Sequence, residues 1–238
     1  MMSAVLAGAV LGGSAAWAQK YTAPRAPWDN PHPDLSGIWQ AKATVGDDIE
    51  KSIVDPSNKK IPYLPEAAAK VKTNAANKAK EDPVNKCYMP GVPRLMYMNY
   101  PFQIFQTPKY IAVVSEYSHT YRIIYMDGSP HVDYLPFWLG DSRGHWEGDT
   151  LVVDVLSFND QTWLDKAGND HSDQLHVVER YTRTSPNTLE YEATITDPKT
   201  YSKPWKIKVP LTLDNKPNAR LMEYECQQLA PVRSETGN

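Results

Sequence analysis

The stretch from Gly144 to Thr182 gathers many of the side chains that are able to move protons. It holds three of the six histidines, several acidic residues and a sixteen-residue connection, 159–174, that has no strand pattern. Connections this long inside a compact domain are usually functional or disordered, and the internal Trp163 argues against disorder. Ionisable and aromatic groups at this density predict a functional site rather than a simple link between strands.

A histidine oriented by a carboxylate is the chemistry that this loop predicts. We take His176 or His171 as the general base, because an imidazole titrates near neutral pH. Asp165 or Asp160 would orient it. A metal site formed by His171, His176 and Glu179 is disfavoured, because His176 and Glu179 fall on opposite faces of a regular strand.

Two other places offer acids and bases. Glu116, His119 and Arg122 lie near one hairpin end, where they would polarise an oxygenated substrate; a solvated hairpin tip is the alternative. Asp154 lies in the expected strand 150–158, whose two faces are both mainly apolar. Burial there would raise its pKa, as in a general acid, unless it forms a structural ion pair.

The residues expected to bind substrate are Arg122, Tyr117, Asn159, Trp163, Glu179, Tyr201, Trp205 and Tyr224. For Tyr201, Trp205 and Tyr224, core packing is the alternative.

Several classes of function are not supported by the sequence. It has no G-x-S-x-G, no glycine-rich phosphate loop and no dinucleotide fingerprint. The net charge is −3, which gives no electrostatic basis for binding nucleic acid. We therefore expect an enzyme without an organic cofactor or a metal, of the lyase, isomerase or hydratase type, acting on a small hydrophobic oxygenated compound. The alternative is a non-catalytic protein that carries an apolar small molecule.

The N-terminus predicts export. An apolar run from Ala4 to Ala15 precedes Ala16-Trp17-Ala18, which fits the small-x-small cleavage rule, so residues 1–18 read as a signal peptide. The run is too short to span a membrane, and we expect a periplasmic or secreted protein that is not inserted in the membrane once the signal is removed. Cys87 and Cys226 lie far apart and match no ligand spacing, which predicts a disulfide rather than a nucleophile or a metal ligand.

The remaining chain divides into an arm, one domain and a tail. Residues 19–35 are proline-rich and predict an extended arm, and residues 231–238 predict a flexible tail. Between them, 36–230 read as a single domain. A helix is expected at about 65–80, because Pro65-Glu66 suits the first turn of a helix and Asp82-Pro83 ends it.

The rest of the domain predicts strands. They are expected at 36–45, 102–107, 110–117, 120–126, 140–147, 150–158, 175–183, 189–196, 204–213 and 221–226. A meander this long must close or split into two sheets to protect its edges. We expect a mainly β fold, an antiparallel meander closed into a calycin- or lipocalin-like barrel with one external helix. A two-sheet sandwich is the alternative. A closed barrel of about eight strands leaves room for one small ligand. The sequence leaves the oligomeric state open.

Two resemblances accompany this interpretation. Gly37-Ile38-Trp39 resembles the G-x-W of the first strand of lipocalins and other calycins, which implies a barrel. More widely, DLSGIW, WEGDTLVVD, FND-x-TWLD and HS-x-x-LHVVER resemble the motifs of a family of exported proteins of proteobacteria and acidobacteria. That resemblance covers nearly all of the chain after residue 18. It implies one whole domain whose central loop belongs to the family pattern, and it brings no activity with it.

Overall fold

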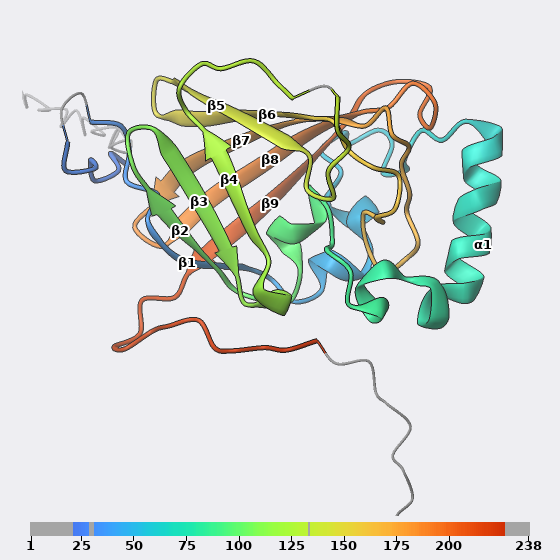
Figure 1. Ribbon diagram of the computed structural model, residues 1–238, viewed down its shortest axis with the longest axis horizontal. Helices are drawn as coiled ribbons and strands as arrows, with labels where there is room; N and C mark the ends of the chain where they lie inside the picture. The colour runs from blue at the N-terminus through green and yellow to red at the C-terminus, as the bar shows by residue number, and fades with distance from the viewer. Residues whose placement is uncertain (1–20, 29–30, 133, 227–238) are drawn as a thin grey trace, which may run out of the picture.

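A closed barrel of nine strands makes up most of the structure, a computed structural model that describes residues 21–28, 31–132 and 134–226 (Figure 1). The strands neighbour one another in chain order, and β1 closes the barrel against β9. They are β1 Gly37–Ala41, β2 Phe102–Gln106, β3 Tyr110–Ser115, β4 Tyr121–Tyr125, β5 Asp141–Glu147, β6 Thr150–Leu156, β7 His176–Ser185, β8 Thr188–Thr196 and β9 Trp205–Leu213. The closed, mainly β barrel predicted from the sequence is confirmed.

Alternating side chains give the barrel its inside and its outside. In β9, Trp205, Ile207, Val209 and Leu211 are buried, whereas the residues between them are exposed. Because successive side chains of a strand point to opposite faces of a sheet, this pattern turns one face of β9 inward. The outward Lys208 instead contacts glutamates on β8. Period-two alternation therefore fixes the register of this half of the barrel.

The interior is packed with the protein's own side chains. Trp39, Tyr97, Phe102, Tyr181 and Tyr191 are among the largest fully buried residues. A barrel of this size has an interior just wide enough for side chains to fill. The expected room for a ligand inside the barrel is therefore taken up by large aromatic residues, and the groove described below lies at the edge of the sheet instead.

One strand pair differs from the expected meander. β4 and β5 are parallel, whereas every other neighbouring pair is antiparallel. The chain leaves β4, passes over the outside of β5 and β6 through residues 126–140, and then enters β5 in the same direction as β4 (Figure 1). The expectation of a wholly antiparallel barrel is wrong here, because the connection between β4 and β5 is a crossover rather than a hairpin turn.

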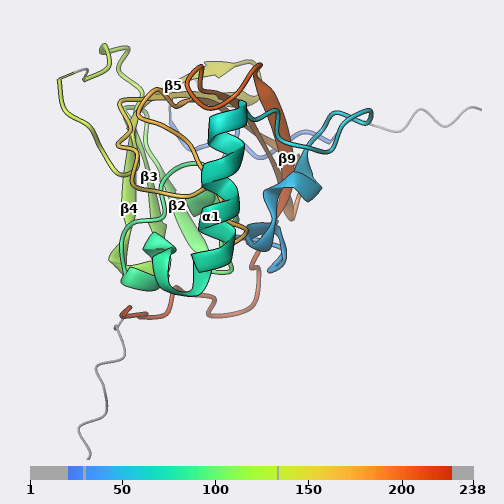
Figure 2. The same ribbon diagram turned by 90° about the vertical axis from the view of Figure 1, so that its right-hand side faces the viewer.

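Helix α1, Pro65–Glu81, lies outside the barrel beside one of its ends (Figures 1 and 2). It has no buried residue, as its alanine-rich sequence predicts, and it begins with Pro65 in the first turn. Gly168 packs closely against it, since a Cβ there would lie 2.8 Å from the Ala75 nitrogen. The other helical elements are short 3-10 helices at Val45–Asp47, Ile49–Ser52, Pro83–Lys86, Arg94–Tyr97 and Tyr117–His119.

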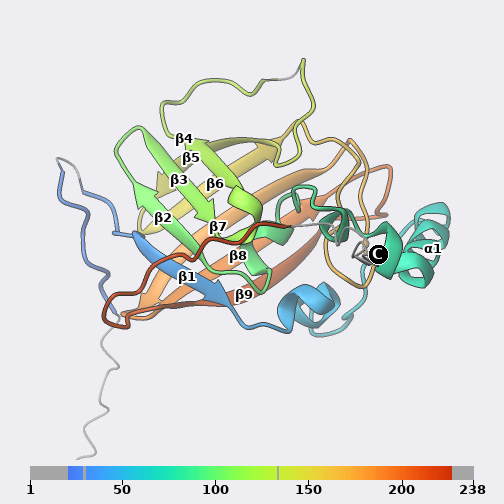
Figure 3. The same cartoon turned by 60° about the horizontal axis from the view of Figure 1, so that its bottom comes forward.

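The C-terminal segment crosses the barrel without joining it. Residues 221–226 form no strand in the structure, so the strand expected there is wrong. The segment runs across the barrel in Figure 3 and is held by a disulfide between Cys87 and Cys226, whose Cα atoms are 5.5 Å apart. The disulfide predicted from the sequence is confirmed. Tyr224 of this segment packs against Tyr100, whereas Met222 is exposed, so the apolar residues of LMEYEC do not mark sheet pairing.

The described part of the N-terminal arm folds back on itself. Arg25 and Pro33 form an antiparallel bridge, and Arg25 also pairs with Asp149 at the tip of the β5–β6 hairpin. The ring of His32 stacks on Trp146 with ring centroids 4.7 Å apart. The arm therefore lies against the barrel. The predicted signal peptide and tail lie outside the described residues.

Candidate functional site

The sheet opens between β4 and β5. These strands pair only at Ile124 with Ser142 and at Tyr125 with Arg143. The earlier part of β4 lies along a gap that the crossover 126–140 borders. Gly140 ends the crossover with a φ of +66°, and a Cβ there would lie 2.7 Å from Val155. Only glycine fits this close turn, so the sequence itself requires a tight approach where the chain enters β5.

A groove of about 450 Å³ occupies this gap. Its walls are aromatic, with Tyr121 and Tyr125 on one side and Phe137 and Trp138 on the other. Tyr88 stacks on Trp138 with ring centroids 5.2 Å apart and supports that wall from behind. Concave, mainly apolar sites of this size with a few polar groups are the usual form of small-molecule sites.

Backbone strain is found at the rim of the groove. Ser118 and His119 both line it, and both have positive φ, +48° and +53°. Each such residue costs roughly 1–2 kcal/mol relative to an ordinary conformation. Strained backbone of this kind is concentrated at functional sites, where the surrounding structure holds it in place. The strain therefore points to the same groove as its shape does.

The floor of the groove contains a buried ion pair. Arg122 points into the barrel, where its Nη1 donates to Glu179 at 3.1 Å and its Nη2 also pairs with Glu179. Its Nε donates to the hydroxyl of Ser142 at 2.9 Å. The hydroxyls of Tyr181 and Tyr191 donate to Glu179 at 2.9 and 2.8 Å. The carboxylate is thus surrounded by donors, which a buried charge requires.

This network keeps its protons in place. Burial raises the pKa of Tyr181 and of Tyr191 well above the ordinary value, and the Glu179 charge raises both further. Burial opposes the charge of Arg122, but the adjacent Glu179 carboxylate raises its pKa overall. The arginine therefore stays charged and the tyrosines stay protonated donors. The group positions Arg122 at the groove rather than exchanging protons.

A second cluster lies on the outer face of the sheet, beside the groove. His131, from the crossover, lies between two carboxylates: its Nδ1 is 2.9 Å from Asp141 and its Nε2 is 2.9 Å from Asp154. The other oxygen of Asp154 is 2.5 Å from Nε2 of His176. Asp141 lines the groove and also accepts from Arg143 at 2.8 Å. We call Asp141, His131, Asp154 and His176 the His–Asp cluster.

The geometry of this cluster sets its proton content. A neutral imidazole has a single N–H, yet both nitrogens of His131 face carboxylate oxygens at hydrogen-bonding distance. Both contacts are hydrogen bonds only if a second proton is present, on the ring or on one of the carboxyls. The cluster is therefore arranged to hold a proton between Asp141 at the groove and Asp154 on the outer face.

The structure brings together some of the predicted residues. His176 and Asp154 are hydrogen-bonded, and Arg122 and Glu179 form the ion pair. His176 points outward and Glu179 inward, as strand parity predicts. Asp154 was expected to be a carboxylate among apolar residues. Instead, it lies on the outer face of β6, where its side chain is 37 % exposed. The crossover supplies it with a polar neighbour, His131.

His171 and Asp165 lie elsewhere and do not contact each other as base and orienter. His171 is buried, its Nδ1 donates to the Ser172 carbonyl, and its Nε2 accepts from Thr162. Burial lowers its pKa, so the ring is neutral at pH 7. Its tautomer is fixed by the carbonyl, which can only accept. This histidine holds the loop together and faces no groove.

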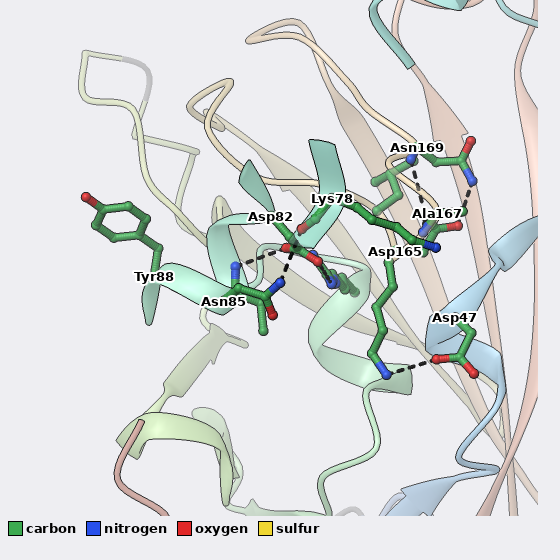
Figure 4. A network of polar contacts seen from close by, with 12 residues as sticks. Asp47, Lys78, Asp82, Asn85, Tyr88, Asp165, Ala167 and Asn169 are labelled. Carbon is green, nitrogen blue, oxygen red and sulfur yellow. Dashed lines mark hydrogen bonds and ion pairs between the residues drawn. The ribbon is translucent and has the colours of Figure 1, made fainter. Parts of the chain in front are cut away.

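Asp165 organises the loop backbone (Figure 4). Its carboxylate accepts from the backbone of Ile49 at 2.8 Å and from the side chain of Asn169 at 2.6 Å. Burial raises its pKa, and these hydrogen bonds oppose that increase. Asp160 is exposed, and Asn159 accepts from the Gln161 backbone in a turn. Asp165 therefore holds the loop backbone in place rather than orienting a base.

The other predicted residues have structural contacts. Glu116 accepts from the Met222 backbone, and His119, at the rim of the groove, pairs with Glu225. The hydroxyl of Tyr117 donates to backbone carbonyls near the disulfide. Trp163, Tyr201, Trp205 and Tyr224 pack in the core or against other aromatic rings. None of these four lines the groove.

Sequence reasoning missed His131, Asp141, Arg143 and Trp138. The sequence feature that could have found them is the one that pointed to the loop 159–174. Residues 127–140 form a long connection that carries a histidine beside a proline and several aromatic residues. The tertiary contact with Asp154 is what gives the histidine its role, and no local pattern predicts that contact.

Comparison with protein-family models and with curated proteins found no match. Within the described ranges, no group of three or more His, Cys, Asp or Glu side chains is arranged to hold a metal ion. No helix of the described chain is long and apolar enough to cross a bilayer.

Proposed function

We propose that the protein is an exported acid–base enzyme that acts on a small, hydrophobic, oxygenated compound in the groove between β4 and β5. Lyase, isomerase or hydratase chemistry suits this proposal, because such reactions need a positioned acid, a positioned base and an apolar pocket. The observation that carries it is the contact of Asp141, a groove residue, with the His131–Asp154–His176 chain.

Binding would rely on the aromatic walls. Tyr121, Tyr125, Phe137 and Trp138 offer flat apolar surface to a planar or alicyclic compound. The Arg143 guanidinium lies 4.6 Å from the centre of the Tyr125 ring, so this wall is held by a cation–π contact as well as by packing. A compound that entered would displace water from mainly apolar surface.

Proton transfer would use the His–Asp cluster. Asp141 lies at the groove, and His176 lies at the far end of the cluster with a side chain that is 39 % exposed. Each member is within hydrogen-bonding distance of the next, so a proton taken or given at the groove has a route to solvent. An enzyme of this type must restore its protonation state after each turnover, and such a route supports that step.

Deuterium exchange tests the proposal without knowledge of the product. Small ketones and esters would be incubated with the protein in D2O, and deuterium at the carbon beside the carbonyl would be followed by NMR. We expect the wild-type protein to accelerate exchange for at least one compound that binds in the groove. His176→Asn should slow it by about 10²-fold or more. His145→Asn is the matched control, since His145 lies on β5 beside Glu147 and outside the cluster. Equal rates in wild type and His176→Asn would refute the proposal.

A non-catalytic binding protein is the second candidate. The observation that favours it is the saturation of Asp141, which accepts from the Val132 backbone and twice from Arg143 and also contacts His131. With this many contacts, the carboxylate has few lone pairs left to reach a compound in the groove. If a compound binds tightly in the groove and the protein accelerates deuterium exchange of none of the compounds, this candidate is favoured.

An exported location is part of the proposal. The disulfide is compatible with an oxidising compartment, and it joins segments 139 residues apart. The predicted partner is a hydrophobic small molecule, and the oligomeric state stays open. Fusion of residues 1–30 to a reporter that is active only outside the cytoplasm would test export.

A further inference from the structure

The floor of the groove offers hydrogen-bond donors without net charge. Thr120, Arg122 and Ser142 all line the groove, and all three are more than nine-tenths buried. Thr120 and Arg122 lie two residues apart on the approach to β4 and share the inward face, and Ser142 faces them from β5. The floor is thus assembled across the gap in the sheet.

The hydroxyl of Thr120 has no hydrogen-bond partner among the described residues. A buried hydroxyl without a partner costs free energy, and native structures rarely leave one. Since the residue lines the groove, an acceptor supplied by a ligand would remove the deficit.

Arg122 and Ser142 also retain donor capacity. A guanidinium has five N–H groups, and the hydrogen bonds to Glu179 and Ser142 use three of them. Ser142 accepts from Arg122 through its oxygen, so its own hydrogen remains to be donated within the described structure. The positive charge of Arg122 is already matched by the Glu179 carboxylate.

We infer that the groove floor recognises an uncharged acceptor oxygen, a ketone or ester carbonyl, on a compound with an apolar body. A carboxylate would bring a second negative charge beside Glu179, and the two arginines that line the groove are already paired, Arg122 with Glu179 and Arg143 with Asp141. A hydrocarbon would leave the Thr120 hydroxyl without a partner. This inference rests on the proposed function, because it takes the groove as the substrate site, and it names the substrate class of that site.

Three probes of one shape test the inference: 2-acetylnaphthalene, 2-naphthoate and 2-ethylnaphthalene. Their dissociation constants would be measured by quenching of tryptophan fluorescence and by calorimetry on the full-length mature chain. We expect the ketone to bind about tenfold more tightly than the hydrocarbon and than the carboxylate, which corresponds to one net hydrogen bond. Tighter binding of the carboxylate, or binding of none of the three at millimolar concentration, would overturn the inference.

Thr120→Val removes the hydroxyl and keeps the shape. It should weaken ketone binding about tenfold and leave hydrocarbon binding unchanged. Because the hydroxyl has no partner in the described part of the chain, the variant should fold with at least wild-type stability. Ser142→Ala gives a second measurement, and Thr150→Val, whose hydroxyl bonds Thr182 on the outer face, is the control. Equal losses for ketone and hydrocarbon in Thr120→Val would show a change of shape and refute the inference.

The same ketone separates the two proposals. If it binds with the expected preference but its methyl protons exchange no faster than in buffer, acid–base catalysis fails and the inference holds. If exchange is accelerated while ketone and hydrocarbon bind equally, the inference fails and the catalytic proposal holds.

Discussion

Asp154 and His176 share a hydrogen bond of 2.5 Å on the outer face of the barrel, although 22 residues separate them in the chain. β6 and β7 are antiparallel neighbours, and the register places Asp154 opposite Val178, so His176 is the next outward residue along β7. The second oxygen of Asp154 reaches His131 of the crossover. This one carboxylate therefore joins the sheet to the segment that borders the groove.

Asp154→Asn should remove the link between the two imidazoles while it preserves the shape of the side chain. An amide offers one acceptor oxygen and one NH2 group in place of two acceptor oxygens, so it cannot accept from both rings. We expect proton exchange of a bound ketone to fall by roughly 10²-fold. The NMR signals of the His176 ring should also change. Glu147→Gln, a carboxylate beside His145 and Arg180 on the same face, should change neither readout.

The Arg122–Glu179 pair gives a stability prediction. Arg122→Met and Glu179→Leu should each reduce the free energy of unfolding by about 3–5 kcal/mol, because each leaves the other charge buried without its partner. The double variant should be less destabilised than the sum of the two, which denaturant unfolding of all four proteins measures. The exposed Lys208–Glu190 pair is the control, with a coupling below about 1 kcal/mol. Additive losses in the Arg122–Glu179 cycle would contradict this account.

His171 should make stability depend on pH. Burial lowers its pKa in the folded state, whereas the ring titrates near the usual value of about 6.5 in the unfolded chain. The unfolded state therefore binds more protons below about pH 6.5, so stability is complete above that pH and falls as the pH decreases. We expect the slope of unfolding free energy between pH 7 and pH 5 to be shallower in His171→Gln by up to about 1.4 kcal/mol per pH unit. The exposed His145→Gln should keep the wild-type slope. An unchanged slope in His171→Gln would show that His171 does not cause the dependence.

Reduction of the Cys87–Cys226 disulfide should destabilise the fold. The bond closes a loop of 139 residues, and loss of such a closure costs roughly 4–5 kcal/mol in the chain-entropy model. Denaturant unfolding with and without a thiol reductant measures the difference. The double variant Cys87→Ser/Cys226→Ser should match the reduced protein and should not respond to reductant. A response of the double variant would mean that the reductant acts elsewhere.

The sequence contained most of the information on elements. Strands such as β9 and helix α1 follow from alternating apolar residues and from the Pro65-Glu66 start, because these patterns are local and each has a direct geometric meaning. The disulfide followed from having two cysteines far apart without ligand spacing. The expected C-terminal strand is wrong because alternation alone does not supply a pairing partner: Tyr224 packs against Tyr100, and Met222 is exposed.

The site was less predictable. Strand parity correctly separated His176 from Glu179, since parity is a local property of the backbone. The proposed partners of His176 came from its own loop, where Asp165 instead binds the backbone of Ile49. The actual partner, Asp154, was named as a candidate acid, but as an isolated one. The partners of His176 were chosen by their proximity in the sequence. In a barrel, however, hydrogen-bonding partners come from neighbouring strands, which are distant in the sequence.

By itself, the amino-acid sequence determined that this chain is a β-rich domain with one external helix, a disulfide and a cluster of ionisable groups near β6 and β7. Only the tertiary structure decided where a small molecule would bind. The crossover 126–140 makes β5 parallel to β4, opens the groove between them and carries His131 to Asp154. The physical reason is range: periodicity and propensity act over a few residues, whereas strand direction and the partner of a buried or half-buried charge depend on contacts between distant segments.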